Sequence, residues 1–215
     1  MKKSLVSVIL VASMMLSIGG CGLKKKNDSK ILEGNWKADL ECEKIVTDEL
    51  SKDEDAKSNN MAMIDAIKKY ADFNELEAIV TFKFNQDGTY SIEPDLEQWN
   101  STWGAFSTAA LNGAREYYKS IGVGDAMVEG FESKEEFLGY SIAYTLMDLR
   151  IPITKAVFVQ QNGKYKAING KLYINKDSSK DVDITTDYYG TYEITGESEL
   201  TVKNRDGVEY ICQKE

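Results

Sequence analysis

The segment EAIVTFKFNQDGTYSIEPD, residues 77–95, constrains the fold more than any other part of the sequence. Apolar side chains alternate along two arms on either side of Asp87-Gly88, a dipeptide suited to the positive φ angle of a tight turn. Residues two apart in a strand face the same side of a sheet, so each arm has one apolar face. The segment predicts an antiparallel β-hairpin whose buried face carries Ala78, Val80, Phe82, Phe84, Tyr90 and Ile92.

The same alternation recurs in the C-terminal part of the chain. Asn169-Gly170 is expected to form a two-residue turn, which pairs Ala167 with Leu172. Alternating segments follow in DYYGTYEITG, SELTVK and GVEYICQ. With a first strand at 35–46 and a less regular one at 157–161, we expect about eight or nine antiparallel strands, closed into an up-and-down barrel or a sandwich because closure removes exposed edges.

A helical insertion of about 94–150 interrupts the strands. After Pro94 the apolar residues recur every three or four positions, which predicts one buried stripe on a long helix. Ser133 and Glu136 form a capping-box signature for a second helix, which is apolar on more than one side and is expected to be largely buried, ending before Pro152. The predicted fold class is therefore α+β, mainly antiparallel β, with a helical insertion.

The first twenty residues have the order of a secretory signal. Lys2 and Lys3 precede an apolar run at 5–18, which is too short to span a bilayer and ends in Gly19-Gly20-Cys21. Ile18-Gly19-Gly20-Cys21 resembles the lipobox of bacterial lipoproteins, and the resemblance implies cleavage before Cys21 and lipid attachment to its sulfur. The alternative is an ordinary secretion signal with a chance cysteine.

This interpretation divides the chain into a signal peptide at 1–20, a lipidated tether at 21–33 and a folded domain at 34–215. The domain would lie on the extracytoplasmic face of the cell membrane, held by acyl chains whose buried methylenes each contribute about 0.8 kcal/mol. The lysines at 24–26 and 30 would either face anionic headgroups or form a solvated linker.

Charge and composition exclude several classes of function. Without the first 30 residues the chain keeps 20 of its 26 basic and 34 of its 35 acidic side chains, a net charge of −14. Such a body is repelled by nucleic acid. The chain has no histidine, so it cannot assemble Ser-His-Asp or Cys-His machinery or the usual histidine-bearing zinc sites.

Two cysteines remain for the fold if Cys21 is lipidated. Cys42 and Cys212 both fall on the apolar face of an expected strand, near opposite ends of the domain. Two interpretations stay open: a disulfide between them, which an oxidising exterior would permit, or two buried free thiols that pack as small apolar groups.

Several short motifs are similar to those of the lipocalins. Gly34-Asn35-Trp36 resembles the G-x-W motif that opens them, and Thr186-Asp187-Tyr188 matches their second motif in letters. FNQDGTY and YGTYEITGESELTV resemble hairpins of lipocalin-like lipoproteins of low-GC Gram-positive bacteria, most of them without an assigned function. The resemblance implies that Trp36 closes the base of a barrel against a basic residue of a late strand, here Lys203 or Arg205.

Two kinds of non-enzymatic function follow as expectations. The first is binding of a small apolar ligand in the barrel or in a cleft between helices and sheet. The second is a structural or interaction role in which the helical insertion contacts another envelope protein. No metal or cofactor is predicted. No catalytic residue is predicted either, because pairs of carboxylates at catalytic separation are expected everywhere in a chain with 35 acidic residues. The residues that could line the ligand cleft are Trp99, Trp103, Phe106, Tyr117 and Tyr118, although aromatics at helical spacing more often belong to a core.

Overall fold

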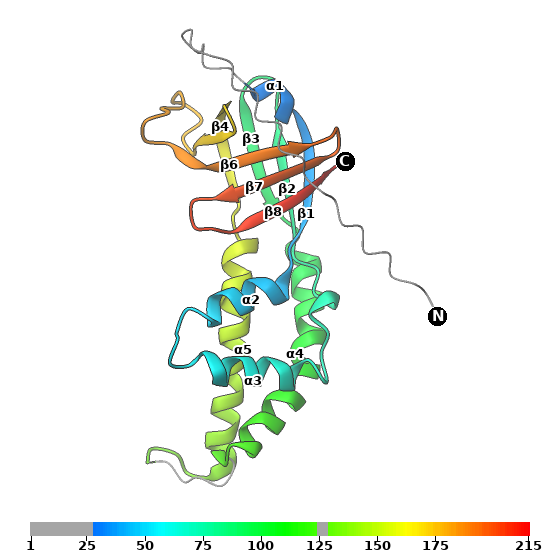
Figure 1. The fold of residues 1–215 in the computed structure, drawn as a ribbon, viewed down its shortest axis with the longest axis vertical. Coiled ribbons are helices and arrows are strands. Elements are labelled where there is room, and N and C mark those ends of the chain that lie inside the picture. The colour runs from blue at the N-terminus through cyan, green and yellow to red at the C-terminus, as the bar shows by residue number, and fades with distance from the viewer. Residues whose placement is uncertain (1–27, 124–128) are drawn as a thin grey trace, which may run out of the picture.

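The computed structural model describes residues 28–123 and 129–215, which form a β-barrel at one end and an arm of helices extending from it (Figure 1). The predicted lipidation site Cys21 and the signal peptide lie outside the described residues. The strands are β1 (Gly34–Asp39), β2 (Ile79–Phe84), β3 (Thr89–Pro94), β4 (Gln161–Ile168), β5 (Lys171–Asn175), β6 (Tyr188–Thr195), β7 (Glu199–Asn204) and β8 (Glu209–Lys214). The helices are α1 (Ser29–Leu32), α2 (Cys42–Leu50), α3 (Lys57–Ile67), the 3-10 turn η1 (Phe73–Glu75), α4 (Leu96–Ser120) and α5 (Lys134–Val157).

The eight strands form a closed antiparallel barrel in chain order, and β8 pairs with β1. This confirms the α+β fold class with a barrel and a helical insertion, and it is compatible with a lipocalin-like fold. Both predicted hairpins form. In the first, Phe82 lies opposite Ile92, and in the second Ala167 lies opposite Leu172, which is the predicted register. In the second turn Asn169 has φ 49° and Gly170 has φ 73°, as a two-residue hairpin loop requires.

Side chains fill the barrel interior. The ring of Phe82 lies 5.2 Å from that of Tyr210 and 6.3 Å from that of Phe84, measured between centroids. Phe84 in turn packs on Tyr165 at 4.8 Å. Trp36, Leu172 and Leu200 are also fully buried. The barrel is therefore a packed core along much of its length.

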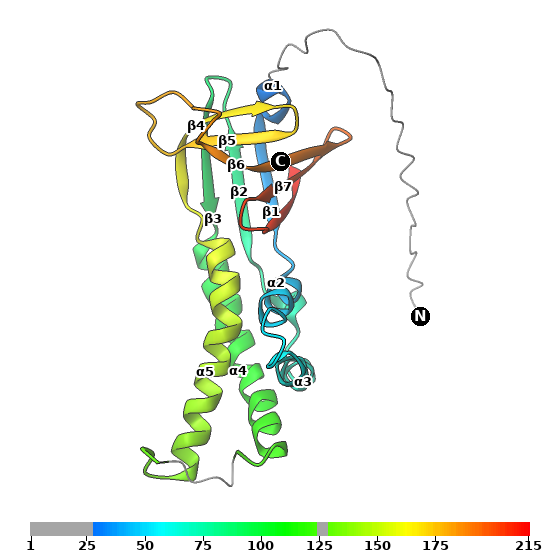
Figure 2. The same cartoon turned by 60° about the vertical axis from the view of Figure 1, so that its left-hand side comes forward.

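The end of the barrel away from the helices is covered by α1 (Figures 1 and 2). Oδ2 of Asp28 accepts hydrogen bonds from the Tyr192 hydroxyl at 2.9 Å and from the Asn169 backbone N–H at 3.0 Å. The indole N–H of Trp36 donates to the Leu32 carbonyl at 2.7 Å. These bonds connect the segment before β1 to β1, to β6 and to the β4–β5 turn.

The helical arm consists of α2, α3, η1, α4 and α5. The first three lie between β1 and β2 in the chain, and α4 and α5 lie between β3 and β4. Figure 2 shows α4 and α5 side by side along the arm, with α2 and α3 packed across them. Gly113 of α4 permits close contact with α3, because a Cβ there would lie 2.6 Å from the Ala66 carbonyl oxygen.

Two boundary predictions were wrong. The first strand ends at Asp39 rather than near residue 46, and Cys42 begins α2. The apolar residues at 42, 46 and 50 fit helical spacing, and β2 starts opposite Asp39, so a longer β1 would have had no partner there. The second helix continues through Pro152 to Val157, and no strand forms at 157–161 beyond the first residue of β4.

No helix in the described part of the chain is both long and apolar enough to span a membrane.

Candidate functional site

The residues predicted to line a ligand cleft lie in the core of the helical arm. Trp99, Trp103, Phe106 and Tyr117 are buried, and the Trp103 ring lies 5.6 Å from the rings of both Trp99 and Phe106. Tyr118 is half-buried, and its hydroxyl shares a 2.8 Å hydrogen bond with the Thr145 hydroxyl of α5. These side chains hold the helices together and line none of the cavities described below.

The base of the barrel contains Gly34 and Trp36, as the G-x-W pattern suggests, but with a different basic partner. Lys214 of β8 places its Nζ 5.1 Å from the centroid of the Trp36 ring. Gly34 makes room for it, because a Cβ at Gly34 would lie 3.1 Å from Cε of Lys214. The prediction of Lys203 or Arg205 was therefore wrong: β8, not β7, is the neighbour of β1.

Both cysteines are free and buried, so the structure has the second of the two predicted states. Burial raises the pKa of each thiol to about 12, with a smaller contribution from the Asp39 carboxylate at Cys42. Neither thiol is a thiolate at neutral pH, and both act as small apolar groups. Within the described residues no group of cysteines and carboxylates is arranged to hold a metal ion.

A cleft of about 1180 Å³ lies between the barrel, α2 and the end of α5. Its apolar floor includes Ile45, Pro152 and Val208. Six lysines and seven acidic residues surround that floor, so neither sign of charge dominates and the cleft favours neither an anion nor a cation. The charged residues are Lys37, Lys44, Lys52, Lys155, Lys203 and Lys214 with Asp39, Glu41, Asp48, Glu49, Asp206, Glu209 and Glu215.

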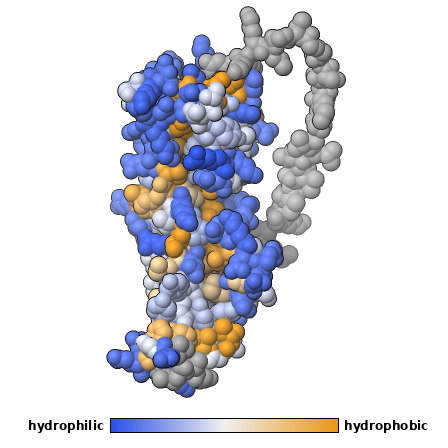
Figure 3. Space-filling view, turned by 90° about the vertical axis from the view of Figure 1, so that its left-hand side faces the viewer, coloured by the Kyte–Doolittle hydropathy of each residue, from blue (hydrophilic) through white to orange (hydrophobic). Residues whose placement is uncertain are grey.

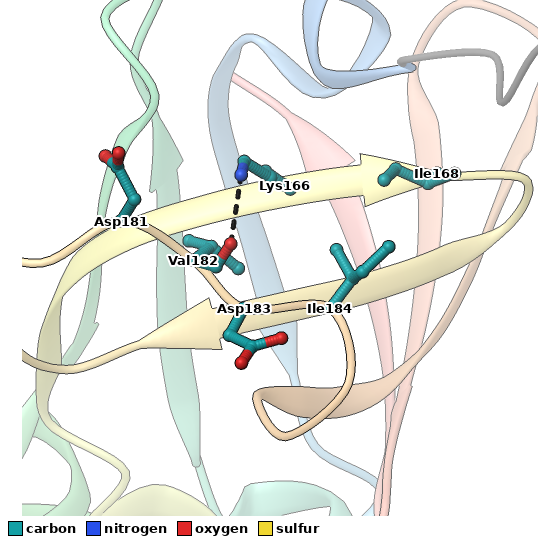
Figure 4. A pocket seen from close by; sticks show the side chains of 6 residues that line it. All are labelled: Lys166, Ile168, Asp181, Val182, Asp183 and Ile184. Atoms are coloured by element: carbon teal, nitrogen blue, oxygen red, sulfur yellow. Dashed lines mark hydrogen bonds between the residues drawn. The ribbon is translucent and has the colours of Figure 1, made fainter.

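A smaller pocket of about 600 Å³ lies on the outside of the barrel, where the loop between β5 and β6 crosses β4 (Figure 4). Its polar groups hold the loop in place. Lys166 Nζ donates to the Val182 carbonyl at 2.9 Å, and the Asp183 carboxylate accepts from both the hydroxyl and the N–H of Thr185. These bonds lower the pKa of Asp183. The pocket is best explained as a consequence of loop packing.

The mouth of the barrel on the helix side has a cavity of about 330 Å³, lined in part by Gln161, Ile174 and Tyr189. Tyr189 is the extra residue of a β-bulge, because Leu172 pairs with Gly190 while Tyr173 pairs with Tyr188. Burial raises the pKa of Tyr189 to about 12. Nearby, Oη of Tyr90 and Oε1 of Gln161 are buried without a hydrogen-bond partner among residues 28–123 and 129–215.

Among the described residues, a row of apolar side chains on α5 is exposed. We call Phe137, Tyr140, Tyr144, Met147 and Ile151 the α5 stripe. Tyr140, Tyr144 and Met147 are each more than half exposed, at 51%, 52% and 54%, and Ile151 is 42% exposed. The Tyr140 ring lies 5.2 Å from that of Tyr144 and 5.4 Å from that of Phe131, so the aromatic surface continues toward the tip of the arm.

The opposite face of α5 faces the rest of the protein. It carries the buried residues Ile142, Thr145, Leu149, Ile153 and Ala156. The expectation of a largely buried helix was therefore wrong, because only one of its two apolar faces is covered. In Figure 3 hydrophobic surface lies at the end of the arm away from the barrel and appears again nearer the barrel. Residues 140, 144, 147 and 151 are spaced by four, three and four positions, and this spacing indicates a second apolar face of α5. The prediction of a largely buried helix treated the two faces as one.

A scan against protein-family models finds no match to this chain, and searches of curated proteins and of solved structures find none either.

Proposed function

We propose that this chain is a membrane-anchored extracytoplasmic lipoprotein, without enzymatic activity, that uses its helical arm to contact another protein. The observation that carries the proposal is the α5 stripe. Aromatic residues and methionine are enriched in protein interfaces, and a row in which Tyr140, Tyr144 and Met147 are each more than half exposed is typical of a contact site.

The position of the tether supports this role. Helix α1, which begins directly after Asp28, lies at the end of the barrel farthest from the arm (Figures 1 and 2). From Cys21 to Asp28 a fully extended chain spans roughly 25 Å at most, so a lipid on Cys21 would hold that end of the barrel near the membrane. Helices α4 and α5, each about 36 Å long at 1.5 Å per residue, would then point away from the bilayer.

Photocrosslinking in intact cells tests the contact role. A photoreactive phenylalanine analogue at Tyr144 should give a covalent protein adduct, whereas the same group at the exposed Arg115 of α4 should not. If none of the positions of the α5 stripe gives a covalent adduct, the proposal is contradicted. The anchor is tested separately: Cys21→Ser should abolish fatty-acid labelling and release the protein from the membrane fraction.

Binding of a small apolar ligand is the second candidate. The cavity at the barrel mouth favours it, since about 330 Å³ is the lower end of the range for ligand sites and Oε1 of Gln161, which lines it, is buried without a hydrogen-bond partner in the described part of the chain. Titration with a panel of small apolar molecules, followed by tryptophan fluorescence and by the change in unfolding temperature, tests it. No response to any member of the panel would count against this candidate.

A further inference from the structure

We infer that the partner of the α5 stripe is a second copy of this chain, and that the two α5 helices pair antiparallel. This inference rests on the proposed contact function and specifies the partner. Three observations carry it: the spacing of the stripe, the charges beside it and the charge of the rest of the molecule.

The stripe has the spacing of a coiled-coil seam. Phe137, Tyr144 and Ile151 are seven residues apart, and so are Tyr140 and Met147, which places them at alternating intervals of three and four. Such a seam faces a second helix in a coiled coil. Within this chain the seam faces away from α4, because the buried residues of α5 lie on its other side.

The flanking charges select the antiparallel orientation. Lys134 and Asp148 lie on one flank of the seam, and Glu136 and Arg150 lie on the other. A two-fold axis across an antiparallel pair brings each flank against the same flank of the second copy. When Tyr140 lies opposite Tyr144 of the second copy, Lys134 comes close to Asp148 and, on the other flank, Glu136 comes close to Arg150. Symmetry repeats each of these opposite-charge pairs.

A parallel pair would have less favourable contacts. In that orientation the two different flanks meet, and Arg150 lies near Lys155 of the second copy, five residues further along. Both side chains are positive, and symmetry repeats this repulsion as well. The charge pattern thus favours one orientation and disfavours the other.

The local charge around the seam also favours self-association. Residues 31–215 carry a net charge of −14, which makes two copies repel each other over most of their surface. Helix α5 has three basic and three acidic residues and is neutral. The seam is therefore an uncharged strip on an acidic body, where a second copy meets less repulsion than the net charge of the whole chain implies.

Arg150 is compatible with this arrangement. Its guanidinium lies 5.6 Å from the Trp103 ring and donates to Oδ1 of Asn100 at 3.3 Å, so it is held against α4 on one flank of the seam. Guanidinium has five N–H donors, so Arg150 keeps donors free for a carboxylate of the second copy.

The mass of the mature, full-length chain in detergent micelles tests the inference, with protein mass determined by light scattering. At roughly 100 µM, a concentration suited to a weak interface, we expect twice the mass of one chain. Tyr144→Glu should give a monomer with an unchanged unfolding midpoint, because Tyr144 is half exposed in the single chain. A wild-type monomer, or a dimer that Tyr144→Glu leaves intact, would overturn the inference.

A charge exchange tests the orientation. In the antiparallel pair, Lys134→Glu puts an acidic group against Asp148 of the other copy. Because symmetry repeats this repulsion, the substitution should weaken the dimer about tenfold. Adding Asp148→Lys in the same chain restores opposite charges and should restore the dimer to within about threefold of wild type. A dimer that is insensitive to Lys134→Glu but strengthened by Lys155→Glu would be parallel, contrary to the inference.

These outcomes separate the inference from the proposed function. If the chain is monomeric in micelles while Tyr144 crosslinks to a different protein in cells, the self-pairing fails and the contact function stands. If the chain is monomeric and no position of the α5 stripe crosslinks, both fail.

Discussion

The ammonium group of Lys214 lies over the ring of Trp36, and the two residues are direct partners in the pairing of the last strand with the first. The contact joins the two ends of the barrel at the position where it closes. The Trp36 indole also donates to the Leu32 carbonyl, so one side chain connects α1, β1 and β8.

Changes at this pair should therefore affect stability in a graded way. Trp36→Phe keeps an aromatic ring but leaves the buried Leu32 carbonyl without its donor, and we expect a loss of about 1–3 kcal/mol in the free energy of unfolding. Lys214→Ala removes a cation–π contact at an exposed site and should cost about 0.5–1 kcal/mol. Urea unfolding measures both. An equal loss for the two variants would contradict this assignment of roles.

The packing of α3 on α4 depends on one glycine. Gly113→Ala would place a methyl group against the Ile67 backbone and the Ala66 carbonyl, so α3 would have to shift, and we expect a destabilisation of about 1–3 kcal/mol. Gly104 lies on the same helix with no atom within 4 Å of an added Cβ. Gly104→Ala should therefore stabilise by about 0.5–1 kcal/mol. Thermal unfolding of the two variants tests the contrast, and a gain at both positions would refute the close contact.

The two buried thiols should be inert in the folded protein. In a Cys21→Ser variant, a thiol reagent at pH 8 should modify Cys42 and Cys212 only slowly, because both are buried and protonated. After unfolding in guanidinium without reductant, two thiols per chain should react. A chain that has no reactive thiol in denaturant, and is lighter by two hydrogens, would contain a disulfide instead.

Stability should fall at alkaline pH. In the unfolded chain each thiol loses its proton near the ordinary pKa of 9.0, whereas in the folded chain the pKa is about 12. Between these values the unfolded state binds fewer protons than the folded state, so raising the pH favours unfolding by about 1.4 kcal/mol per pH unit for each thiol. Tyr165 and Tyr189, whose pKa values burial raises to about 12, add to the slope above pH 10.

The free energy of unfolding in urea, measured at several pH values from 8 to 11, checks this prediction. The Cys42→Ala, Cys212→Ala double variant should show a smaller decline than wild type, whatever its stability at pH 8. An identical slope would mean that the thiols do not contribute.

Much of the barrel was predictable because its signals are local. Alternation of apolar residues and the turns at Asp87-Gly88 and Asn169-Gly170 specify which strands pair within each hairpin. The partner of Trp36 was not predictable in the same way. It depends on which strand closes against β1, and that pairing joins residues about 175 positions apart.

The errors at Cys42 and on α5 have other physical causes. Around Cys42 the apolar residues fit both a strand and a helix, and only the absence of a neighbouring strand decides between them. On α5 the sequence has two apolar faces, and composition does not tell which face the rest of the fold covers. The α5 stripe can be identified as the exposed face only when the position of α4 on the other side of the helix is known.

The bonds around Asp28 also determine how the molecule would respond to a pulling force. If the chain is tethered by its N-terminus, tension enters the fold at Asp28, which is bonded to Ala167, Asn169 and Tyr192 rather than to β1 alone. The force therefore acts first on the hydrogen bonds to β4, β6 and the β4–β5 turn. Only when these bonds break does it act on the pairing of β1 with its neighbouring strands. The barrel would act as a mechanical clamp that protects the arm from strain at the membrane.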